Sequence, residues 1–330
     1  GFKNEVKNGY KDMQFQYKLE NNLGINVLSL FDGMSGAQIA LERAGIPILN
    51  YFASEIDKFA MKITQKNYPR TIQKGDVDSI NKNALPKIDL LIGGSPCQGF
   101  SVSGKRLNFD DPRSKLFFSY VKILEEVNPT FFLLENVKMK KEYQDIISKY
   151  IGVEPVEINS NLVSAQNRKR LYWTNIPFSM PEDKHIYFKD IIEKGFVDKD
   201  KSLCLDASYF KGGSLKTLIH NYVDKSRRQI VFDEPVIIQK PRGKNKFGLR
   251  ALNGKVPTLS SSSWQTNNFI VYPKDSKWRM LTPVECERLQ TVSDNYTEGV
   301  SKTQRYKMLG NGFTVDIIAH ILKGMKGVPL

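Results

Sequence analysis

One cysteine lies where a nucleophile could meet a substrate. Cys97 is part of a glycine-rich loop, residues 93–101 (GGSPCQGFS), that directly follows an apolar run. A cysteine thiolate is a strong nucleophile, and backbone amides or nearby cations favour it by lowering the pKa of the thiol. A structural cysteine usually lies within an apolar element, whereas Pro96 and polar residues flank this one. The loop therefore predicts a nucleophilic cysteine, with a structural thiol as the alternative.

An acidic residue follows a second apolar run. Residues 130–134 (TFFLL) are typical of a buried strand, and Glu135 and Asn136 come directly after them. Burial disfavours the charged form of a carboxyl group, so an acid at such a strand end can stay protonated and donate a proton. Glu135 is therefore a candidate general acid. The alternative is a partly buried acid paired with an arginine.

A short basic segment could supply cations to the same chemistry. Residues 166–170 (QNRKR) contain Arg168 and Arg170, separated by one lysine. Because side chains alternate along an extended segment, we expect both arginines on one face and Lys169 on the other. The alternative is a solvated basic edge strand.

A third group of residues could hold a small ligand. Residues 31–36 (FDGMSG) follow an apolar strand and open a helix, and their glycines would let a ligand approach the backbone. They lack the complete dinucleotide fingerprint, so a plain tight turn is equally consistent. Glu55 ends the next strand, where a carboxylate can bind both hydroxyls of a ribose, although a surface acid fits as well. Residues 75–77 (GDV) have the same two interpretations.

Alternating strands and helices would position these residues. The expected strands are 26–31, 48–53, 88–92 and 130–134, and the expected helices are 39–45, 59–67 and 113–127. This order predicts an α/β fold with a mainly parallel sheet covered on both faces. Ligands in such folds bind at the carboxyl ends of the strands. Asp32, Glu55, Cys97 and Glu135 all follow predicted strand ends, so one rim of the sheet would collect them.

The alternation divides the chain into four parts. We expect an N-terminal arm over 1–24, a catalytic domain over 25–175, a smaller irregular lobe over 176–277, and a return to the catalytic domain over 278–330. The lobe is rich in proline and has 18 basic and 11 acidic residues, a net charge of +7. After it, residues 282–285 (TPVE) predict a helix that begins with a capping box, and residues 313–323 predict a final amphipathic helix.

Composition excludes several classes of protein. With 40% hydrophobic and 25% charged residues the chain is neither disordered nor fibrous, and it lacks an apolar run long enough to cross a membrane. Three cysteines and three histidines, widely scattered, favour neither a disulfide framework nor a metal site, and indicate a reducing compartment. The net charge of +14 favours a polyanionic partner, with a merely basic protein as the alternative.

Taken in order, these motifs resemble those of the C5-cytosine DNA methyltransferases over residues 26–324. The matching segments are 31–36, Glu55, Asp76, 96–98, 135–137, 166–170, 279–285 and 310–312. The resemblance implies a Rossmann-like class I methyltransferase fold whose smaller lobe recognises the target. One departure lies at residues 310–314 (GNGFT), where many bacterial members have a small residue and a valine after the Gly-Asn pair.

The resemblance also implies a role for each catalytic candidate. Cys97 would add to C6 of cytosine and so activate C5 for methylation. Glu135 would contact N3, and Asn136 would shape that site. Arg168 would assist at the cytosine O2, and Arg170 would brace the pocket or the phosphate backbone.

S-adenosylmethionine is the cofactor that the resemblance implies, with S-adenosylhomocysteine as product. Phe31 and Ile56 would contact the adenine, Glu55 would bind the ribose, Asp76 would hold the adenine amino group, and Asn311 would close the site. The complete set of implied cofactor residues is Phe31, Asp32, Gly33, Ser35, Gly36, Glu55, Ile56, Asp76, Val77, Pro96, Asn311 and Phe313.

Double-stranded DNA is the implied partner, and the target cytosine must leave the helix to be reached. The implied DNA contacts are Gln98, Ser101, Lys105, Arg106, Arg242, Lys244, Lys246, Arg250 and Thr258. We expect a monomer that needs neither metal nor membrane, in the cytoplasm of a bacterium or a phage-infected cell. Restriction-modification, phage DNA protection and gene regulation all remain open as roles.

Three rival functions fit parts of the same pattern. A tRNA cytosine-C5 methyltransferase would share the motifs. Such enzymes typically have a Cys-Phe-Thr signature and a short second lobe, whereas this sequence lacks the signature and has a long second lobe. A silent DNA-binding regulator on the same fold would require damage at Cys97, Glu135 or Arg168, and all three are intact. A nicotinamide oxidoreductase would fit the strand and helix order but would leave the cysteine loop and the arginine pair unexplained.

Overall fold

A seven-stranded sheet forms the centre of the computed structural model, which describes residues 13–94, 112–197, 199–211, 228–232 and 278–327. Its strand order is β3-β2-β1-β4-β5-β7-β6. The strands are β1 (Ile25–Leu30), β2 (Ile48–Ser54), β3 (Ile72–Gln73), β4 (Leu90–Gly94), β5 (Phe131–Val137), β6 (Val156–Asn159) and β7 (Lys169–Thr174). All neighbours are parallel except β7, which pairs antiparallel with both β5 and β6. The predicted mainly parallel α/β sheet is confirmed.

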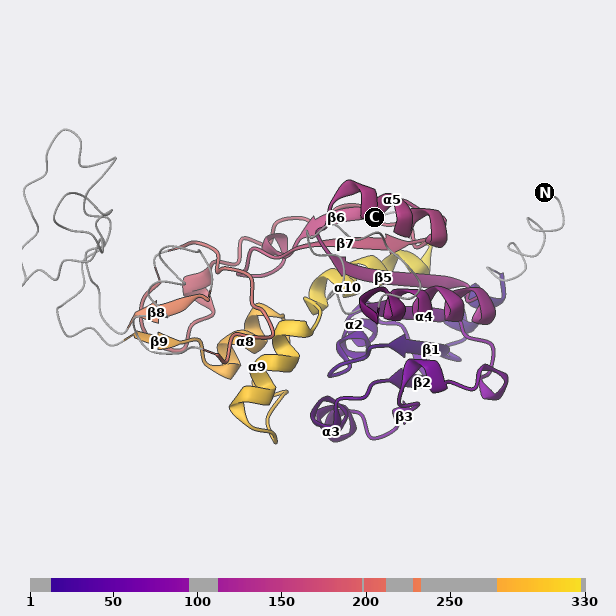
Figure 1. Ribbon diagram of the computed structural model, residues 1–330, viewed down its shortest axis with the longest axis horizontal. Coiled ribbons are helices and arrows are strands. Elements are labelled where there is room, and N and C mark those ends of the chain that lie inside the picture. The colour runs from indigo at the N-terminus through magenta and orange to yellow at the C-terminus, as the bar shows by residue number, and fades with distance from the viewer. Residues whose placement is uncertain (1–12, 95–111, 198, 212–227, 233–277, 328–330) are drawn as a thin grey trace, which may run out of the picture.

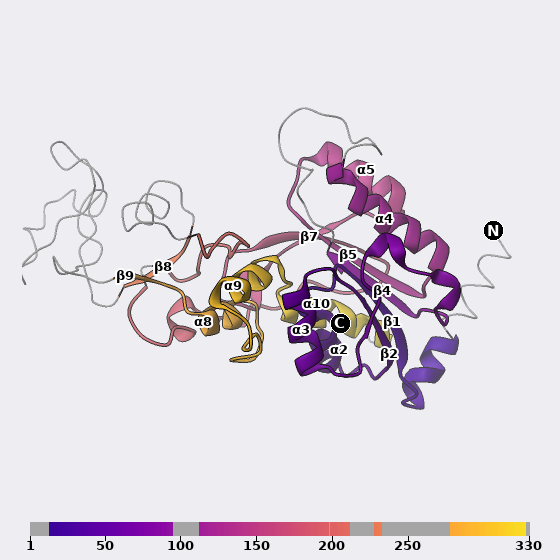
Figure 2. The ribbon, with the colours of Figure 1, turned by 60° about the horizontal axis from the view of Figure 1, so that its bottom comes forward.

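Helices cover both faces of this sheet (Figures 1 and 2). Those on one face are α2 (Gly36–Ala44), α3 (Lys58–Asn67) and α10 (Val315–Lys323), and those on the other are α4 (Pro112–Val127) and α5 (Lys141–Ile151). Successive strand residues supply the two cores in turn, since Val27 belongs to the first and Leu28 to the second. This alternation is why the strands read as continuous apolar runs in the sequence.

A smaller part of the chain lies beyond the carboxyl ends of the parallel strands (Figure 1). It contains the antiparallel pair β8 (Ile230–Phe232) and β9 (Trp278–Met280), followed by α8 (Pro283–Leu289) and α9 (Lys302–Asn311). The predicted capping box at α8 is present, because the Glu285 backbone N–H donates to Thr282 Oγ1 at 3.1 Å and the Thr282 N–H donates to Glu285 Oε2 at 2.8 Å.

Local differences from the predicted elements come from tertiary contacts. Residues 13–20, expected to be part of an arm, are helical, and Phe15 packs edge-on against Phe131 with ring centroids 4.9 Å apart. Lys18 adds an ion pair to the buried Asp89 at 2.7 Å. The last helix begins at Val315, two residues later than expected. In the described residues, no helix is long and apolar enough for a membrane span, and no cluster of acids, histidines and cysteines could hold a metal ion.

Candidate active site

The carboxyl ends of four parallel strands meet at one rim of the sheet. Leu30 at the end of β1 is paired in register with Ser54 in β2 and Gly93 in β4, and Gly94 is paired with Glu135 in β5. The predicted gathering of Asp32, Glu55 and Glu135 at this rim is therefore observed. Residues 95–111 lie outside the described part of the chain. They contain the candidates Pro96, Cys97, Gln98, Ser101, Lys105 and Arg106.

Glu135 and Arg170 form an ion pair at this rim. Arg170 Nε lies 3.1 Å from Glu135 Oε1, and both side chains are largely shielded from solvent, with 14% and 11% exposed. Burial lowers the pKa of the Arg170 guanidinium, but the Glu135 charge raises it, and the net shift is upward. The buried Asn136 follows, with its Oδ1 accepting from the Val137 N–H at 2.8 Å. The acid is thus paired with an arginine, as the alternative interpretation held.

Arg168 occupies a different environment, two residues earlier in the chain. Its side chain is buried, and it donates from Nη1 to Leu205 O at 2.8 Å and from Nη2 to Gly312 O at 2.9 Å. Both Nη atoms also approach Gly310 O, at 3.3–3.4 Å. These last two carbonyls lie at the C-terminal end of α9, where carbonyls lack helical partners and the helix dipole favours a cation. Burial, and then the neighbouring Arg170 charge, lower the pKa of Arg168.

The first glycine loop is held in place by a buried carboxylate. Asp32 accepts hydrogen bonds from Tyr51 OH at 2.6 Å and from the hydroxyl of Ser35. Burial raises the pKa of Asp32 to about 6, opposed by the hydroxyls that bond to it and assisted by the charge of Glu55. Phe31 and Ser35 have positive φ angles of 56° and 60°, so the loop turns sharply on either side of Asp32. Asp32 therefore braces the loop from inside.

Glu55 joins this loop to the next strand end. Its Oε2 accepts from the Gly33 N–H, and its Oε1 accepts from the Ile56 and Asp57 N–H groups, all at 2.8 Å. These bonds hold the carboxylate at the rim. Ile56 is 74% exposed, which is unusual for an isoleucine beside a loop of buried residues. Farther along, the exposed Asp76 accepts from the Asp78 N–H at 2.8 Å and caps a short 3₁₀ helix, η1 (Val77–Ser79).

Phe313 lies between the glycine loop and Glu135. A Cβ atom placed on Gly36 would be 3.6 Å from Phe313 Cδ2. One placed on Gly94 would be 3.0 Å from Phe313 Cε1 and 3.1 Å from Glu135 Oε2. The aromatic ring therefore packs on two glycines, the first residue of α2 and the last residue of β4. Asn311, two residues before Phe313, is the last residue of α9, and its side chain is exposed.

Two residues that order this site had no assigned role in the sequence interpretation. Gln290 and Gln166 are fully buried and joined by a hydrogen bond of 2.9 Å between Gln166 Nε2 and Gln290 Oε1. Gln166 was visible only as the first letter of a motif, and Gln290 carried no signal, because a glutamine after a helix is ordinarily solvated. The exposed Cys204 also approaches this region, with its Sγ 3.6 Å from Arg168 Nη1.

The candidate DNA contacts in the second lobe are not placed. Arg242, Lys244, Lys246, Arg250 and Thr258 all fall within residues 233–277, outside the described part. They stay predictions from the sequence.

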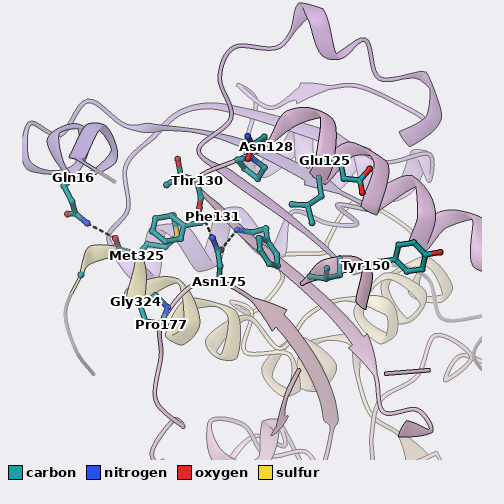
Figure 3. Close-up of a pocket in the computed structure, with 15 residues that line it drawn as sticks. Gln16, Glu125, Asn128, Thr130, Phe131, Tyr150, Asn175, Pro177, Gly324 and Met325 are labelled. Carbon is teal, nitrogen blue, oxygen red and sulfur yellow. Dashed lines mark hydrogen bonds between the residues drawn. The ribbon is translucent and has the colours of Figure 1, made fainter. Parts of the chain in front are cut away.

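A cavity of about 640 Å³ lies at the opposite end of the sheet (Figure 3). Asn128, Thr130 and Phe131, which line it, precede or begin β5, and Gly324 and Met325 close another side. The cavity is thus at the amino end of the strand whose carboxyl end holds Glu135. It is separate from the rim described above.

The fold and the rim define the class first. A parallel sheet with an antiparallel strand β7 inserted between β5 and β6, and with acids at its carboxyl rim, is the Rossmann-like fold of the methyltransferases. The family model described as C-5 cytosine-specific DNA methylase matches residues 25–327. The chain belongs to this family and is a methyltransferase.

Individual relatives agree with this membership. The Type II methyltransferase M.FnuDI of Fusobacterium nucleatum is 29% identical over 332 residues, covering 92% of this chain and 94% of that protein. The Type II methyltransferase M1.ScrFI of Lactococcus lactis subsp. cremoris is 30% identical, covering 91% and 77%. Among solved structures, the Entamoeba histolytica methyltransferase EhMeth shares the fold with a TM-score of 0.61 at 17% identity, covering 92% of this chain and 98% of that one.

Proposed function

We propose that this protein is a DNA (cytosine-5-)-methyltransferase that acts on a flipped cytosine within a specific duplex site. The Glu135–Arg170 pair carries the proposal, because it lies beside Gly94, where the loop that contains Cys97 departs. Family membership and the Type II relatives support DNA as the substrate.

Cys97 begins the proposed reaction by adding its thiolate to C6 of the cytosine. Electrons move into the ring, C5 becomes nucleophilic, and Glu135 contacts N3 to stabilise the altered charge of the ring. C5 would then form a bond to the methyl group as the bond between that group and the cofactor sulfur breaks, which would leave S-adenosylhomocysteine. Loss of the C5 proton to a base and cleavage of the C6–sulfur bond would release the Cys97 thiolate. Asn136, buried beside Glu135, shapes the site for the base.

The geometry favours an exchange of the roles that the sequence implied for the two arginines. Arg168 is committed to the carbonyls of Leu205, Gly310 and Gly312, so its guanidinium is poorly placed to serve a base. Arg170 pairs with Glu135 and keeps partial exposure. We assign Arg170 to the cytosine O2 and Arg168 to bracing the pocket.

The rim residues fit S-adenosylmethionine, which would supply an electrophilic methyl group. Gly33 has no neighbouring atom within 4 Å of an added Cβ, so the loop leaves room for a ligand against its backbone. Glu55 is held where it can accept from ribose hydroxyls, and the exposed Ile56 offers an apolar face to an adenine. Asn311 and Phe313 would close the site.

Duplex DNA requires further functions from the same chain. Base flipping costs a few kcal/mol, which contacts to the opened duplex offset. The smaller lobe, with its net charge of +7, would read the site and bind phosphates. The Type II names of the relatives favour a modification role within a restriction-modification system.

Labelled methyl transfer tests the proposal. With radioactive S-adenosylmethionine, the wild-type protein should label duplex DNA, and bisulfite sequencing should locate the label at cytosines of one sequence. Cys97→Ser should abolish turnover while DNA binding persists, because the hydroxyl is a far weaker nucleophile at neutral pH. Cys286→Ser is the control for loss of a thiol, since Cys286 is a buried core residue of α8.

The results separate the rival functions. Full activity of Cys97→Ser would refute the covalent mechanism. Label on tRNA and none on DNA would favour a tRNA cytosine-C5 methyltransferase. DNA binding without any label would favour a silent regulator.

A further inference from the structure

A buried hydrogen-bond network connects parts of the rim that are distant in sequence. Gln290 caps the C-terminal end of α8, and its side chain is fully buried. Its carboxamide has two donor hydrogens and one acceptor oxygen with two lone pairs, and the structure occupies all of them. Among the described residues, the Gln290 side chain bonds to none of the candidate cofactor or base residues, so its complete set of hydrogen bonds needs another explanation.

Three of the four hydrogen bonds of the carboxamide hold the turn that follows α9. Gln290 Nε2 donates to Leu309 O at 2.6 Å and to Gly312 O at 3.3 Å. Gln290 Oε1 accepts from Thr314 Oγ1 at 3.0 Å. These three partners flank Asn311 and Phe313, the residues proposed to close the cofactor site.

The fourth hydrogen bond of the Gln290 carboxamide holds the segment that leads to the arginines. Gln290 Oε1 accepts from Gln166 Nε2, which also donates to Leu289 O at 2.7 Å. Two residues later, Arg168 Nη2 donates to Gly312 O, the same carbonyl that Gln290 contacts. Gly312 O is therefore shared between the strand that carries the arginines and the Gln290 side chain.

We propose that Gln290 is a positioning residue that holds the cofactor-closing turn and the arginine strand in one fixed register. The proposal rests on the proposed function for the identity of the two sites. Ordering of the turn at 310–314 by a ligand then also orders the segment 166–170. Buried polar networks of this kind specify one arrangement because each unmade bond leaves a desolvated group.

Gln290→Met offers a variant that keeps the shape of the side chain and removes its hydrogen bonds. Most partners retain another bond: Gly312 O keeps Arg168, Gln166 Nε2 keeps Leu289 O, and Leu309 O keeps the Gly312 N–H. Thr314 Oγ1 keeps the hydroxyl of Ser160 at 2.8 Å. The variant is therefore expected to fold, which near-native circular dichroism and cooperative melting would verify.

Gln229→Met is the matched control. Gln229 is also buried and hydrogen-bonded through both ends of its carboxamide, to the Leu203 N–H at 3.0 Å and to Ile230 O at 3.0 Å. It lies beside β8 and has no bond to the turn or to the arginine strand. A general loss of stability would affect both variants alike.

Hydrogen exchange with and without S-adenosylhomocysteine is the test. In the wild type and in Gln229→Met, the ligand should slow exchange about fivefold or more in peptides from 31–36, 310–314 and 166–170. In Gln290→Met, slowing should persist at 31–36 and fall to less than about twofold at 166–170. This measurement needs neither DNA nor methyl transfer.

Other outcomes of the exchange experiment would refute specific parts of the proposal. Equal slowing at 166–170 in Gln290→Met and the wild type would refute the positioning role, as would wild-type slowing that never reaches 166–170. The absence of slowing at 31–36 in the wild type would refute the cofactor assignment and the inference with it. Failure to methylate DNA, with the exchange pattern intact, would count against the proposed substrate alone.

Discussion

Arg168 and Arg170 lie on the same side of one extended segment, yet their guanidinium groups meet different partners. Arg170 meets a carboxylate at 3.1 Å, whereas the Nη atoms of Arg168 donate to three backbone carbonyls and approach the Cys204 thiol. A guanidinium presents a planar fork of donors that an ammonium cannot reproduce. Lysine substitution should therefore reveal the role of each residue.

We expect Arg170→Lys to lower kcat roughly 100-fold while the melting temperature stays near that of the wild type, because a charge-stabilising donor is lost at the site. Arg168→Lys should instead lower the free energy of unfolding by about 1–3 kcal/mol, because buried carbonyls lose their donors. Steady-state kinetics and urea unfolding measure the two effects. Lys169→Ala, on the exposed face between them, is the control. The reverse pattern would contradict our assignment of the arginines.

Asp32 links stability to pH. The pKa of its carboxyl is about 6 in the folded protein against 3.8 ordinarily, because burial disfavours the charge. Between pH 4 and 6 the folded chain keeps a proton that the unfolded chain has released, so this group's stabilising contribution falls as pH rises and is lost above about pH 6. The difference between the two pKa values corresponds to roughly 3 kcal/mol.

Asp32→Asn should remove this dependence. The difference in free energy of unfolding, variant minus wild type, should rise by roughly 3 kcal/mol from pH 4 to pH 7, because only the wild type loses the contribution of Asp32. Urea unfolding at several pH values measures this difference. A difference between the two proteins that stays constant with pH would show that Asp32 is not the group responsible.

Helix α9 shows why one glycine is needed where two elements meet. A Cβ atom on Gly310 would overlap the backbone of Asp206 and Ala207, which passes directly across the helix. The same close approach lets Arg168 reach Leu205 O and Gly310 O together. The glycine therefore serves the docking of the 205–207 segment as well as the turn that follows it.

Gly310→Ala should lower the free energy of unfolding by about 1–3 kcal/mol, because neither backbone can move away without breaking the bonds of Arg168. Thr303→Ala, at an exposed position of the same helix, should have little effect. Urea unfolding measures both, and equal stabilities of the two variants would contradict the close contact.

Elements with strong local patterns were predictable from the sequence. The runs at 26–31, 48–53 and 130–134 are β1, β2 and β5 within one to three residues, and the glycine expected to end α2 is its left-handed cap, Gly45. Residues 13–20 were not, because their helix depends on Phe15 docking against Phe131, a contact more than 100 residues away. Local pattern is weak wherever distant packing stabilises an element.

At the scale of the whole molecule, the sheet carries a core on each face, and its carboxyl rim holds Asp32, Glu55 and Glu135. Half of the net charge of +14 that first suggested a polyanionic partner, +7, falls within residues 176–277. The cavity of about 640 Å³ lies at the other end of the same strands. The rim and the cavity therefore lie at opposite ends of the sheet, because one is at the carboxyl end and the other at the amino end of β5.

The sequence by itself determined the fold class and the gathering of Asp32, Glu55 and Glu135 at one rim, because the apolar period sets each element and the residue after each strand sets the rim. The tertiary structure decided which arginine meets Glu135 and which caps α9. It also brought Gln290 into the site from more than 100 residues beyond Gln166. Such partners depend on how the ends of α8 and α9 meet the segment 166–168, and a linear pattern carries no record of that geometry.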